Sequence, residues 1–303
     1  MRILITGGTG CLGANIAERY LDRGAQVLCL DNFETSRADA LAPHNGLKVV
    51  AGSVGDAALV DKLFDEFHPT VVVHSAASYK DPDNWNEDTE TNVIGTANVV
   101  KAAQRHAVQR FLYLQTALTY GRPQERPVTL AHPLAPFTSY SISKTAGEQY
   151  VAISGLPWVS LRLANIYGPR HYSGPIPTFY KRLKAGQKCF AVDTRRDFLE
   201  MDDFLRLVDL VIEKTEISGP FNVSSGTDVS IKEIFELLVK QIGITLDEPV
   251  KVVPPEGDDV STLLMDPSET QARFGWKAQI GLDEGIARQV AWFDQYGIGE
   301  TDL

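Results

Sequence analysis

The glycine-rich turn near the amino terminus constrains the fold of this chain more than any other stretch. An apolar run at 3–5 precedes the turn, which is typical of a buried parallel strand, and an amphipathic pattern over 14–21 predicts a helix after it. Glycines at 7, 10 and 13 let backbone amides approach a pyrophosphate, and the helix amino terminus favours its negative charge. The stretch therefore predicts a dinucleotide site, although an ordinary strand-to-helix turn can carry the same glycines.

An acidic residue follows the second predicted strand. The apolar run 27–30 ends on Asp31, which lies 18 residues after Gly13. In dinucleotide-binding folds, a carboxylate at about this distance binds the ribose hydroxyls of adenosine. Its charge would repel the 2′-phosphate of NADP, so the sequence favours NAD. Arg37 is an opposing signal, because a nearby arginine can accept that phosphate.

The composition excludes several classes of partner. With 29 Lys and Arg against 39 Asp and Glu, the formal charge is −10, which argues against binding to nucleic acid or to an anionic membrane. Three cysteines without metal-ligand spacing indicate buried thiols in a reducing compartment and no metal. The first strand leaves no room for a signal peptide, and no apolar run reaches membrane-spanning length. We therefore expect a cytoplasmic protein.

Strand and helix patterns alternate through the first half of the chain. Repeated βα units build a doubly wound parallel sheet, and ligands lie beyond the carboxyl ends of its strands. We expect an α/β protein with a Rossmann-type NAD-binding domain over 1–165. Prolines and glycines then crowd 168–177 and the elements shorten, which predicts a smaller, interleaved C-terminal α/β domain for the substrate over 166–303. The further expected strands are 47–51, 71–74, 111–115, 158–163, 221–223 and 250–253, and the further expected helices are 57–67, parts of 85–107 and 137–154, 179–185, 203–213, 231–242 and 282–293.

A tyrosine and a lysine spaced four residues apart supply the candidate chemistry. Tyr140 and Lys144 fall on one helix face, and a nearby ammonium is expected to lower the phenol pKa, which makes Tyr140 a general base. Tyr180 and Lys184 share the spacing but lack a partner at a strand end, so we expect a pair on a helix surface there. Thr116 ends the fifth predicted strand, where its hydroxyl can bond a substrate hydroxyl and help to move its proton.

Several motifs together indicate a family. They are the glycine turn 7–13, Asp31-Asn32, Asn92-Val93-Ile94-Gly95-Thr96, Thr116 before Tyr120-Gly121, Tyr140 with Lys144, Leu161-Arg162 before Asn165, and Arg196-Asp197-Phe198 before Asp202-Asp203. Through them the chain resembles the extended short-chain dehydrogenase/reductases of the NAD-dependent nucleotide-sugar epimerase/dehydratase branch over nearly its whole length. It is most similar to the UDP-galactose 4-epimerase type. The run 115–118 also resembles epimerases of bacterial O-antigen synthesis.

The resemblance implies roles for matching positions. Lys144 would bind the nicotinamide ribose together with Tyr140, and Asn92 would support the lysine through water. Thr116, Asn165 and Arg196 would meet the nucleotide sugar, the last two at its diphosphate. The remaining implied cofactor-binding positions are Gly7, Gly10, Cys11, Leu12 and Gly13 at the pyrophosphate, Asp31, Asn32 and Ser36 at the adenosine ribose, Ser53 and Val54 at the adenine, and Ser75, Ala76, Ala77 and Leu163 at strand ends beside the ligand.

The implied activity is 4-epimerisation of a UDP-sugar through a transient 4-keto intermediate, with a homodimer formed by the helices near 85–107 and 137–154. Alternatives are a 4,6-dehydratase, a 4-keto-sugar reductase and a catalytically inactive NAD-binding sensor. In dehydratases an Asp-Glu pair follows the catalytic threonine, and Ala117-Leu118 stands there instead. Leu114 and Gln115 also depart from the pattern, since serines usually precede the catalytic residue.

Overall fold

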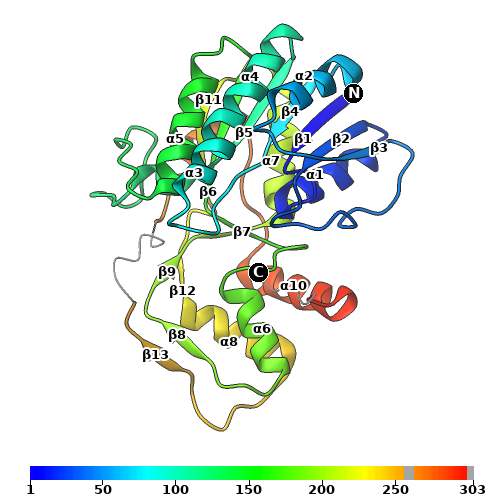
Figure 1. The fold of residues 1–303 in the computed structure, drawn as a ribbon. Coiled ribbons are helices and arrows are strands. Elements are labelled where there is room, and N and C mark those ends of the chain that lie inside the picture. Colours follow the sequence, from blue (N-terminus) through cyan, green and yellow to red (C-terminus); the bar gives the residue numbers. More distant parts are fainter. Residues whose placement is uncertain (256–262, 299–303) are drawn as a thin grey trace.

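A seven-stranded, wholly parallel β-sheet lies at the centre of the computed structural model, which describes residues 1–255 and 263–298 (Figure 1). In spatial order its strands are β11 (Gly219–Val223), β6 (Trp158–Leu163), β5 (Arg110–Thr116), β4 (Val71–His74), β1 (Arg2–Thr6), β2 (Gln26–Asp31) and β3 (Leu47–Ala51). The chain moves outward from β1 to β3 and returns to β4 on the other side of β1. This reversal opens a crevice at the carboxyl ends of β1 and β4, where open α/β sheets bind ligands. The predicted doubly wound sheet is confirmed.

Helices cover both faces of the sheet (Figure 1). One face carries α1 (Cys11–Leu21), α7 (Met201–Glu213) and α9 (Ser268–Phe274), and the other carries α2 (Ala57–Phe67), α4 (Thr96–Arg105) and α5 (Ser139–Ala152). The helix within 85–107 is interrupted: α3 (Trp85–Asp88) passes through a π-helical turn, η1 (Thr89–Gly95), into α4. Such turns are frequent at functional sites, and η1 contains Asn92.

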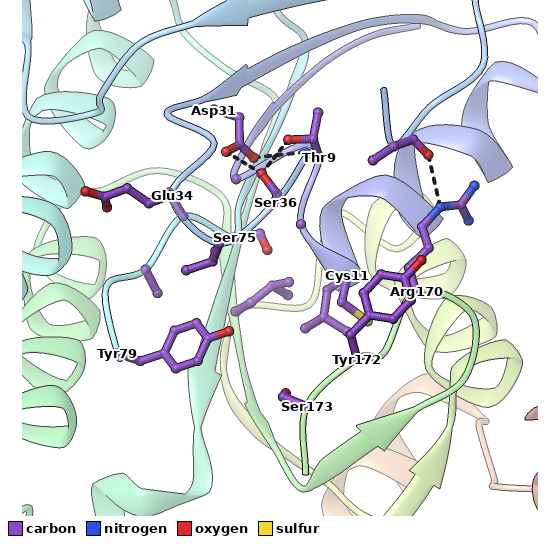
Figure 2. A pocket seen from close by; sticks show the side chains of 18 of the residues that line it. Thr9, Cys11, Asp31, Glu34, Ser36, Ser75, Tyr79, Arg170, Tyr172 and Ser173 are labelled. Atoms are coloured by element: carbon purple, nitrogen blue, oxygen red, sulfur yellow. Dashed lines mark hydrogen bonds between the residues drawn. The ribbon is translucent and has the colours of Figure 1, made fainter. Parts of the chain in front are cut away.

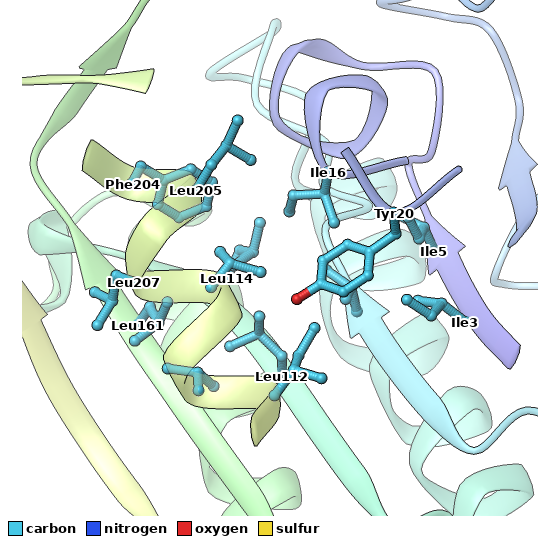
Figure 3. Close-up of a cluster of buried hydrophobic side chains, with 14 of the residues drawn as sticks. Ile3, Ile5, Ile16, Tyr20, Leu112, Leu114, Leu161, Phe204, Leu205 and Leu207 are labelled. Atoms are coloured by element: carbon cyan, nitrogen blue, oxygen red, sulfur yellow. The ribbon is translucent and has the colours of Figure 1, made fainter. Parts of the chain in front are cut away.

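Side-chain alternation along the strands builds the two cores. Ile3 and Ile5 pack with Ile16 and Tyr20 of α1 (Figure 3). Leu4 points to the opposite face and joins the cluster formed with α2, α4 and α5. Because successive side chains of a strand point to opposite faces, each central strand contributes to both cores. Burying one such side chain contributes about 1.5–3 kcal/mol to the free energy of unfolding.

The second half of the chain forms a smaller unit at the carboxyl ends of the strands (Figure 1). Helices α6 (Pro175–Lys184), α8 (Ile231–Ile242) and α10 (Leu282–Tyr296) enclose a third apolar cluster. The strand pairs are β7 (Asn165–Tyr167) with β10 (Phe198–Glu200), β9 (Arg195–Arg196) with β12 (Val229–Ser230), and β8 (Phe190–Val192) with β13 (Lys251–Val253). The chain crosses between the units, because α7 and β11 return to the central sheet. The predicted region 166–303 is thus shared between them, and 256–262 and 299–303 lie outside the described residues.

Several elements differ from the sequence expectation. Helix α6 begins at Pro175, four residues before the predicted start, because proline fits the first turn of a helix, where its missing N–H is not needed. The segment 221–223 was expected in the smaller unit, but it forms an edge of the central sheet as β11. The short strands β7, β9, β10 and β12 had no periodic signal. Across the described ranges, no helix is both long enough and apolar enough to cross a membrane.

Candidate active site

A cavity of about 1150 Å³ lies at the carboxyl ends of the central strands (Figure 2). The candidate catalytic residues Thr116, Tyr140 and Lys144 all line it. It is also lined by the predicted cofactor-binding residues Gly7, Gly10, Cys11, Leu12, Asp31, Asn32, Ser36, Ser53, Val54, Ser75, Ala76, Ala77 and Leu163. Residues at the carboxyl ends of strands β1 to β6 therefore meet residues of α5 at one site, as the topology of the sheet requires.

The glycine turn is closely packed against its neighbours. Gly7 has φ +63°, and a Cβ there would lie 2.8 Å from the backbone nitrogen of Ala76. A Cβ on Gly13 would lie 2.2 Å from the carbonyl oxygen of Gly7. Gly13 is not among the residues that line the cavity; its missing side chain instead lets α1 approach the turn. The amino terminus of α1 is thereby aimed into the cavity, where it favours an anion.

Asp31 is held in place by three donors. Its Oδ2 accepts the N–H of Thr9 at 2.9 Å, and its Oδ1 accepts the N–H of Phe33 and the hydroxyl of Ser36, each at 2.9 Å (Figure 2). The carboxylate is fixed at the end of β2 and lines the cavity. Arg37, the opposing signal, also lines the cavity, where its exposed guanidinium bonds Asp39 at 2.8 Å. The buried carboxylate of Asp31 remains the observation that favours NAD.

The catalytic candidates come from two elements. Thr116 is the last residue of β5, and Tyr140 and Lys144 lie one turn apart in the first half of α5. A capping box formed by Thr138 and Ser141 fixes the start of α5, so Tyr140 sits in the first turn. The hydroxyl of Thr116 lies near the Tyr140 phenol and lowers its pKa. The sequence prediction that these three side chains converge is thus consistent with the geometry.

The expected lowering of the Tyr140 pKa is wrong. Burial raises the pKa of this phenol above its ordinary value, and the hydroxyl of Thr116 opposes that rise only in part. Burial also lowers the pKa of Lys144 to about 7, against the attraction of Glu148. The neighbouring Tyr79 raises the pKa of Tyr140 further. The Nζ atom of Lys144 lies 4.1 Å from the ring centroid of Tyr113.

The second tyrosine and lysine pair lies on the surface only in part, because Lys184 is exposed whereas the Tyr180 ring is buried in the third apolar cluster. Tyr180 donates a hydrogen bond to Asp294 of α10 at 2.5 Å, and Lys184 forms an ion pair with the same carboxylate at 2.7 Å. These contacts join α6 to α10. Tyr180 and Lys184 are not among the described residues that line the cavity.

Three other predicted site residues lie away from the cavity wall. Asn92 is fully buried, and its amide bonds both backbone groups of Ser78 and the hydroxyl of Ser143. It shapes the cavity wall from behind through Ser78, which does line the site. Asn165 donates to the carbonyl oxygen of Asp197 at 2.9 Å, and Arg196 lies on β9. The structure leaves their roles as predictions.

Sequence reasoning missed several cavity residues. Tyr79 approaches Tyr140 edge-on, with ring centroids 6.3 Å apart, and points into the cavity (Figure 2). Arg170, at φ +64°, bonds Glu18 and Asn15 of α1 and the carbonyl oxygen of Ala40, so it ties the segment after β7 to α1 and to the loop after β2. Tyr79 follows the fourth strand and was within reach of the strand-end rule. No sequence motif or spacing indicated a role for Arg170.

The residues present fit a dinucleotide. The cradle at Gly7 and Gly10 lacks side chains where a pyrophosphate would lie, α1 points at it, and Asp31 is oriented for a ribose. The cavity volume exceeds the roughly 300–1,000 Å³ typical of small-molecule sites, which leaves room for a second ligand.

Comparisons with known proteins agree with this geometry. The chain is 56% identical to the enzyme WbmG of Bordetella bronchiseptica, crystallised in complex with NAD and UDP, with a TM-score of 0.95 over 98% of this chain and 96% of that one. It is 44% identical to WbmH of the same organism, in complex with NAD+, with a TM-score of 0.91 over 98% and 99% of the two chains. It is 31% identical to a UDP-glucose 4-epimerase of Mycolicibacterium smegmatis, over 97% of this chain and 98% of that one.

The family assignment follows from a match to a family model. Residues 3–224 match the model of the NAD dependent epimerase/dehydratase family. They include the glycine turn, Asp31, Thr116, Tyr140 and Lys144, which are the residues that meet in the cavity. The chain therefore belongs to the NAD dependent epimerase/dehydratase family, and its cofactor is NAD.

Proposed function

We propose that this protein is an NAD-dependent UDP-sugar 4-epimerase that acts through a transient 4-keto sugar. The observation that carries the proposal is the convergence of Thr116, Tyr140 and Lys144 on one cavity with the glycine turn and Asp31. A site of this kind can exchange both a proton and a hydride with a substrate hydroxyl. Similarity to relatives named as 4-epimerases supports the choice of reaction.

The chain's own residues supply the proton chemistry. Tyr140 removes the proton of the sugar 4-hydroxyl, and Thr116, near the Tyr140 phenol, orients that hydroxyl. Bound NAD supplies the hydride acceptor and, once reduced, the donor. The 4-keto sugar then presents its other face, and Tyr140 returns the proton. Since burial raises the phenol pKa, Tyr140 needs positive charge beside it to act as a base, and we propose that Lys144, one turn away on α5, supplies it.

The other 4-keto chemistries are less well supported. A 4,6-dehydratase needs an acid and a base near the hydride centre, and the two residues after Thr116 are Ala117 and Leu118. A net reductase would release its oxidised cofactor and accept NADPH, which Asp31 opposes. An inactive sensor would not need Thr116, Tyr140 and Lys144 together in one cavity.

A panel of UDP-sugars, incubated with the protein and followed by proton NMR, tests the proposal. We expect one or more sugars to equilibrate with their C4 epimers while NAD is not consumed. Formation of a 4-keto-6-deoxy sugar, or stoichiometric consumption of a reduced cofactor, would assign a different reaction. No change in any sugar would refute the proposed activity.

We further propose how the ligands are divided along the chain. Residues 1–165 form the NAD-binding domain and 166–303 the nucleotide-sugar-binding region, whose segments interleave with it. Asn165, at the boundary, and Arg196 bind the diphosphate. Arginine suits this role because its planar guanidinium matches phosphate oxygens. Arg196→Gln is expected to raise the KM for the UDP-sugar at least tenfold and to leave the Kd for NAD unchanged. An unchanged KM would remove Arg196 from the site.

We also propose a homodimer that pairs the helices near 85–107 (α3, η1 and α4) and 137–154 (α5) with their copies. This face exposes large apolar side chains, among them Ile94, Ile142, Tyr150 and Ile153, and Ile153 is 80% exposed. Exposed apolar patches of this kind mark protein interfaces. Light scattering should give twice the chain mass of 33.3 kDa, and Ile142→Glu with Ile153→Glu should shift it to that of a monomer. A monomeric mass for the unaltered protein would refute the dimer.

We propose finally that the enzyme acts in the cytoplasm, in the synthesis of bacterial surface polysaccharide (O-antigen). The resemblance of 115–118 to epimerases of that process supports it. Deletion of the gene should alter the lipopolysaccharide profile of the source organism. An unchanged profile would contradict this assignment.

A further inference from the structure

Gln115 stands where relatives usually carry a serine, and the proposed function gives it no task. It is the penultimate residue of β5, it is 2% exposed, and it lines the cavity. Its side-chain oxygen accepts the backbone N–H of Thr116 at 2.8 Å. Its side-chain nitrogen donates to the carbonyl oxygen of Lys144 at 3.0 Å. One amide therefore joins the end of β5 to the middle of α5.

The orientation of this amide follows from its partners. The N–H of Thr116 can only donate, so it must face Oε1 of Gln115, and the carbonyl oxygen of Lys144 can only accept, so it must face Nε2. Both ends of the amide are therefore used at once. A serine side chain ends at a single oxygen close to the backbone and cannot span these two partners.

The backbone of Thr116 needs such a partner. Phe111 donates its N–H to Pro157, on the β6 side of β5. Hydrogen-bonding groups alternate along a strand, so the N–H of Thr116 points to the other side, toward β4. The pairing of β4 with β5 ends at His74 opposite Tyr113, three residues before Thr116. The amide of Gln115 thus accepts a hydrogen bond from the Thr116 N–H, which has no partner in the sheet. A buried N–H without a partner would lower the free energy of unfolding by about 1–3 kcal/mol.

We infer that Gln115 is a positioning residue: its amide fixes the hydroxyl of Thr116 relative to Lys144. The inference rests on the proposed function, because the position of the Thr116 hydroxyl relative to Lys144 affects catalysis only if the reaction takes place at Thr116 and Tyr140. Tyr140 lies one turn before Lys144, so the same bond also sets the spacing of the two hydroxyls.

The chain offers a matched control on the same strand face. Tyr113 donates its hydroxyl to the same carbonyl oxygen of Lys144 at 2.9 Å, but among the described residues it is neither a hydrogen-bond partner of Thr116 nor part of the cavity wall. Tyr113→Phe therefore removes one bond to Lys144 and leaves the link to Thr116. Gln115→Met removes both bonds while keeping nearly the same length and burial.

The first test compares these variants in the holoenzyme, on a UDP-sugar that the unaltered protein turns over. We expect Gln115→Met to lower kcat at least tenfold with KM within threefold, and Tyr113→Phe to lower kcat less than threefold. Equal losses in the two variants, or a kcat within twofold for Gln115→Met, would overturn the inference. Thermal unfolding of each variant shows that it is folded.

Gln115→Glu adds a pH signature that a purely structural role would not give. A neutral carboxylic acid can accept from Thr116 and donate to Lys144, whereas a carboxylate cannot donate. The charged groups that face this position are Lys144 and Glu148 on α5 and Arg162 on β6, and the last two pair with each other at 2.5 Å. Burial lowers the pKa of His74 on β4 to about 3, so this ring does not titrate between pH 5.5 and 8. We expect the kcat of Gln115→Glu, relative to the unaltered protein, to fall at least fivefold between pH 5.5 and 8. If the kcat of the variant equals that of the unaltered protein from pH 5.5 to 8, the inference is contradicted.

A measurement that does not depend on turnover separates this inference from the proposed function. Amide hydrogen exchange of Thr116, followed by NMR in the NAD-loaded protein, should be at least tenfold faster in Gln115→Met and within threefold in Tyr113→Phe. Unchanged exchange in Gln115→Met would overturn the inference even in an active enzyme. A protein that turns over no UDP-sugar but shows the faster exchange would refute the proposed function and keep the role of Gln115.

Discussion

The hydroxyl of Thr6 lies 2.6 Å from Nδ1 of His74, at the ends of the adjacent strands β1 and β4. On the other side of the fully buried ring, Nε2 lies 2.9 Å from the hydroxyl of Thr96, whose own proton goes to the carbonyl oxygen of Asn92. The ring therefore donates from Nε2 and accepts at Nδ1, as a neutral imidazole does. Thr6 also accepts the N–H of Ala76 at 3.3 Å. His74 thus holds together the two turns that form the cofactor cradle.

This arrangement predicts a loss of stability in acid. Burial lowers the pKa of His74 from 6.5 to about 3. Between these values the unfolded chain binds a proton that the folded protein does not, so stability falls as pH falls, by about 1.4 kcal/mol per pH unit. His74→Gln should remove this part of the slope. Urea unfolding between pH 4.5 and 7 checks the difference, and parallel slopes for the two proteins would contradict it.

The two tyrosine and lysine pairs give a matched test of Tyr140. Tyr140→Phe should keep NAD binding and lower kcat at least a thousandfold, because the proton acceptor is gone. Tyr180→Phe loses only the bond to Asp294, so its kcat should stay within twofold. Isothermal titration with NAD and the NMR assay measure both properties. Near-normal turnover by Tyr140→Phe would rule out its role as the base.

Asp31 should govern the choice of cofactor. Asp31→Asn keeps one acceptor and turns a donor toward the N–H of Thr9, so the Kd for NAD should rise at least tenfold. The Kd for NADP should change less, because the repulsion of its phosphate is relieved. Asp65→Asn, on the surface of α2, is the control and should change neither value. An unaltered ratio of the two Kd values in Asp31→Asn would exclude Asp31 from the ribose site.

Sequence reasoning reached most of the site because the site obeys topology. Gly7, Asp31, Thr116 and Tyr140 fall at strand ends or in the first turns of helices, and a parallel sheet brings such positions together. The sequence could not predict the direction in which the pKa of Tyr140 shifts, since the burial that raises it is a property of the assembled cavity. It also could not foresee that Asn92 would bond Ser78, because a π-helical turn sets its direction. Arg170 depends on a contact between segments more than 150 residues apart.

A buried ion pair behind the site should matter for stability. Arg162 and Glu148 meet at 2.5 Å, and Arg162 also donates to the hydroxyl of Tyr120 at 2.9 Å. Arg162→Met leaves the charge of Glu148 buried without its partner, which should cost about 3–5 kcal/mol. Adding Glu148→Leu should restore most of that loss. Urea unfolding measures both variants, and a cost below about 1 kcal/mol for the single change would contradict this account.

The fate of the hydrogen at C4 tests the central claim most directly. The UDP-sugar that is turned over is labelled with deuterium at C4 and brought to equilibrium with the holoenzyme in ordinary water. The proposed mechanism predicts that deuterium stays on C4 in both epimers, because the hydride leaves and returns within one closed site. Transfer of deuterium to C6, or its loss to water, would contradict the account.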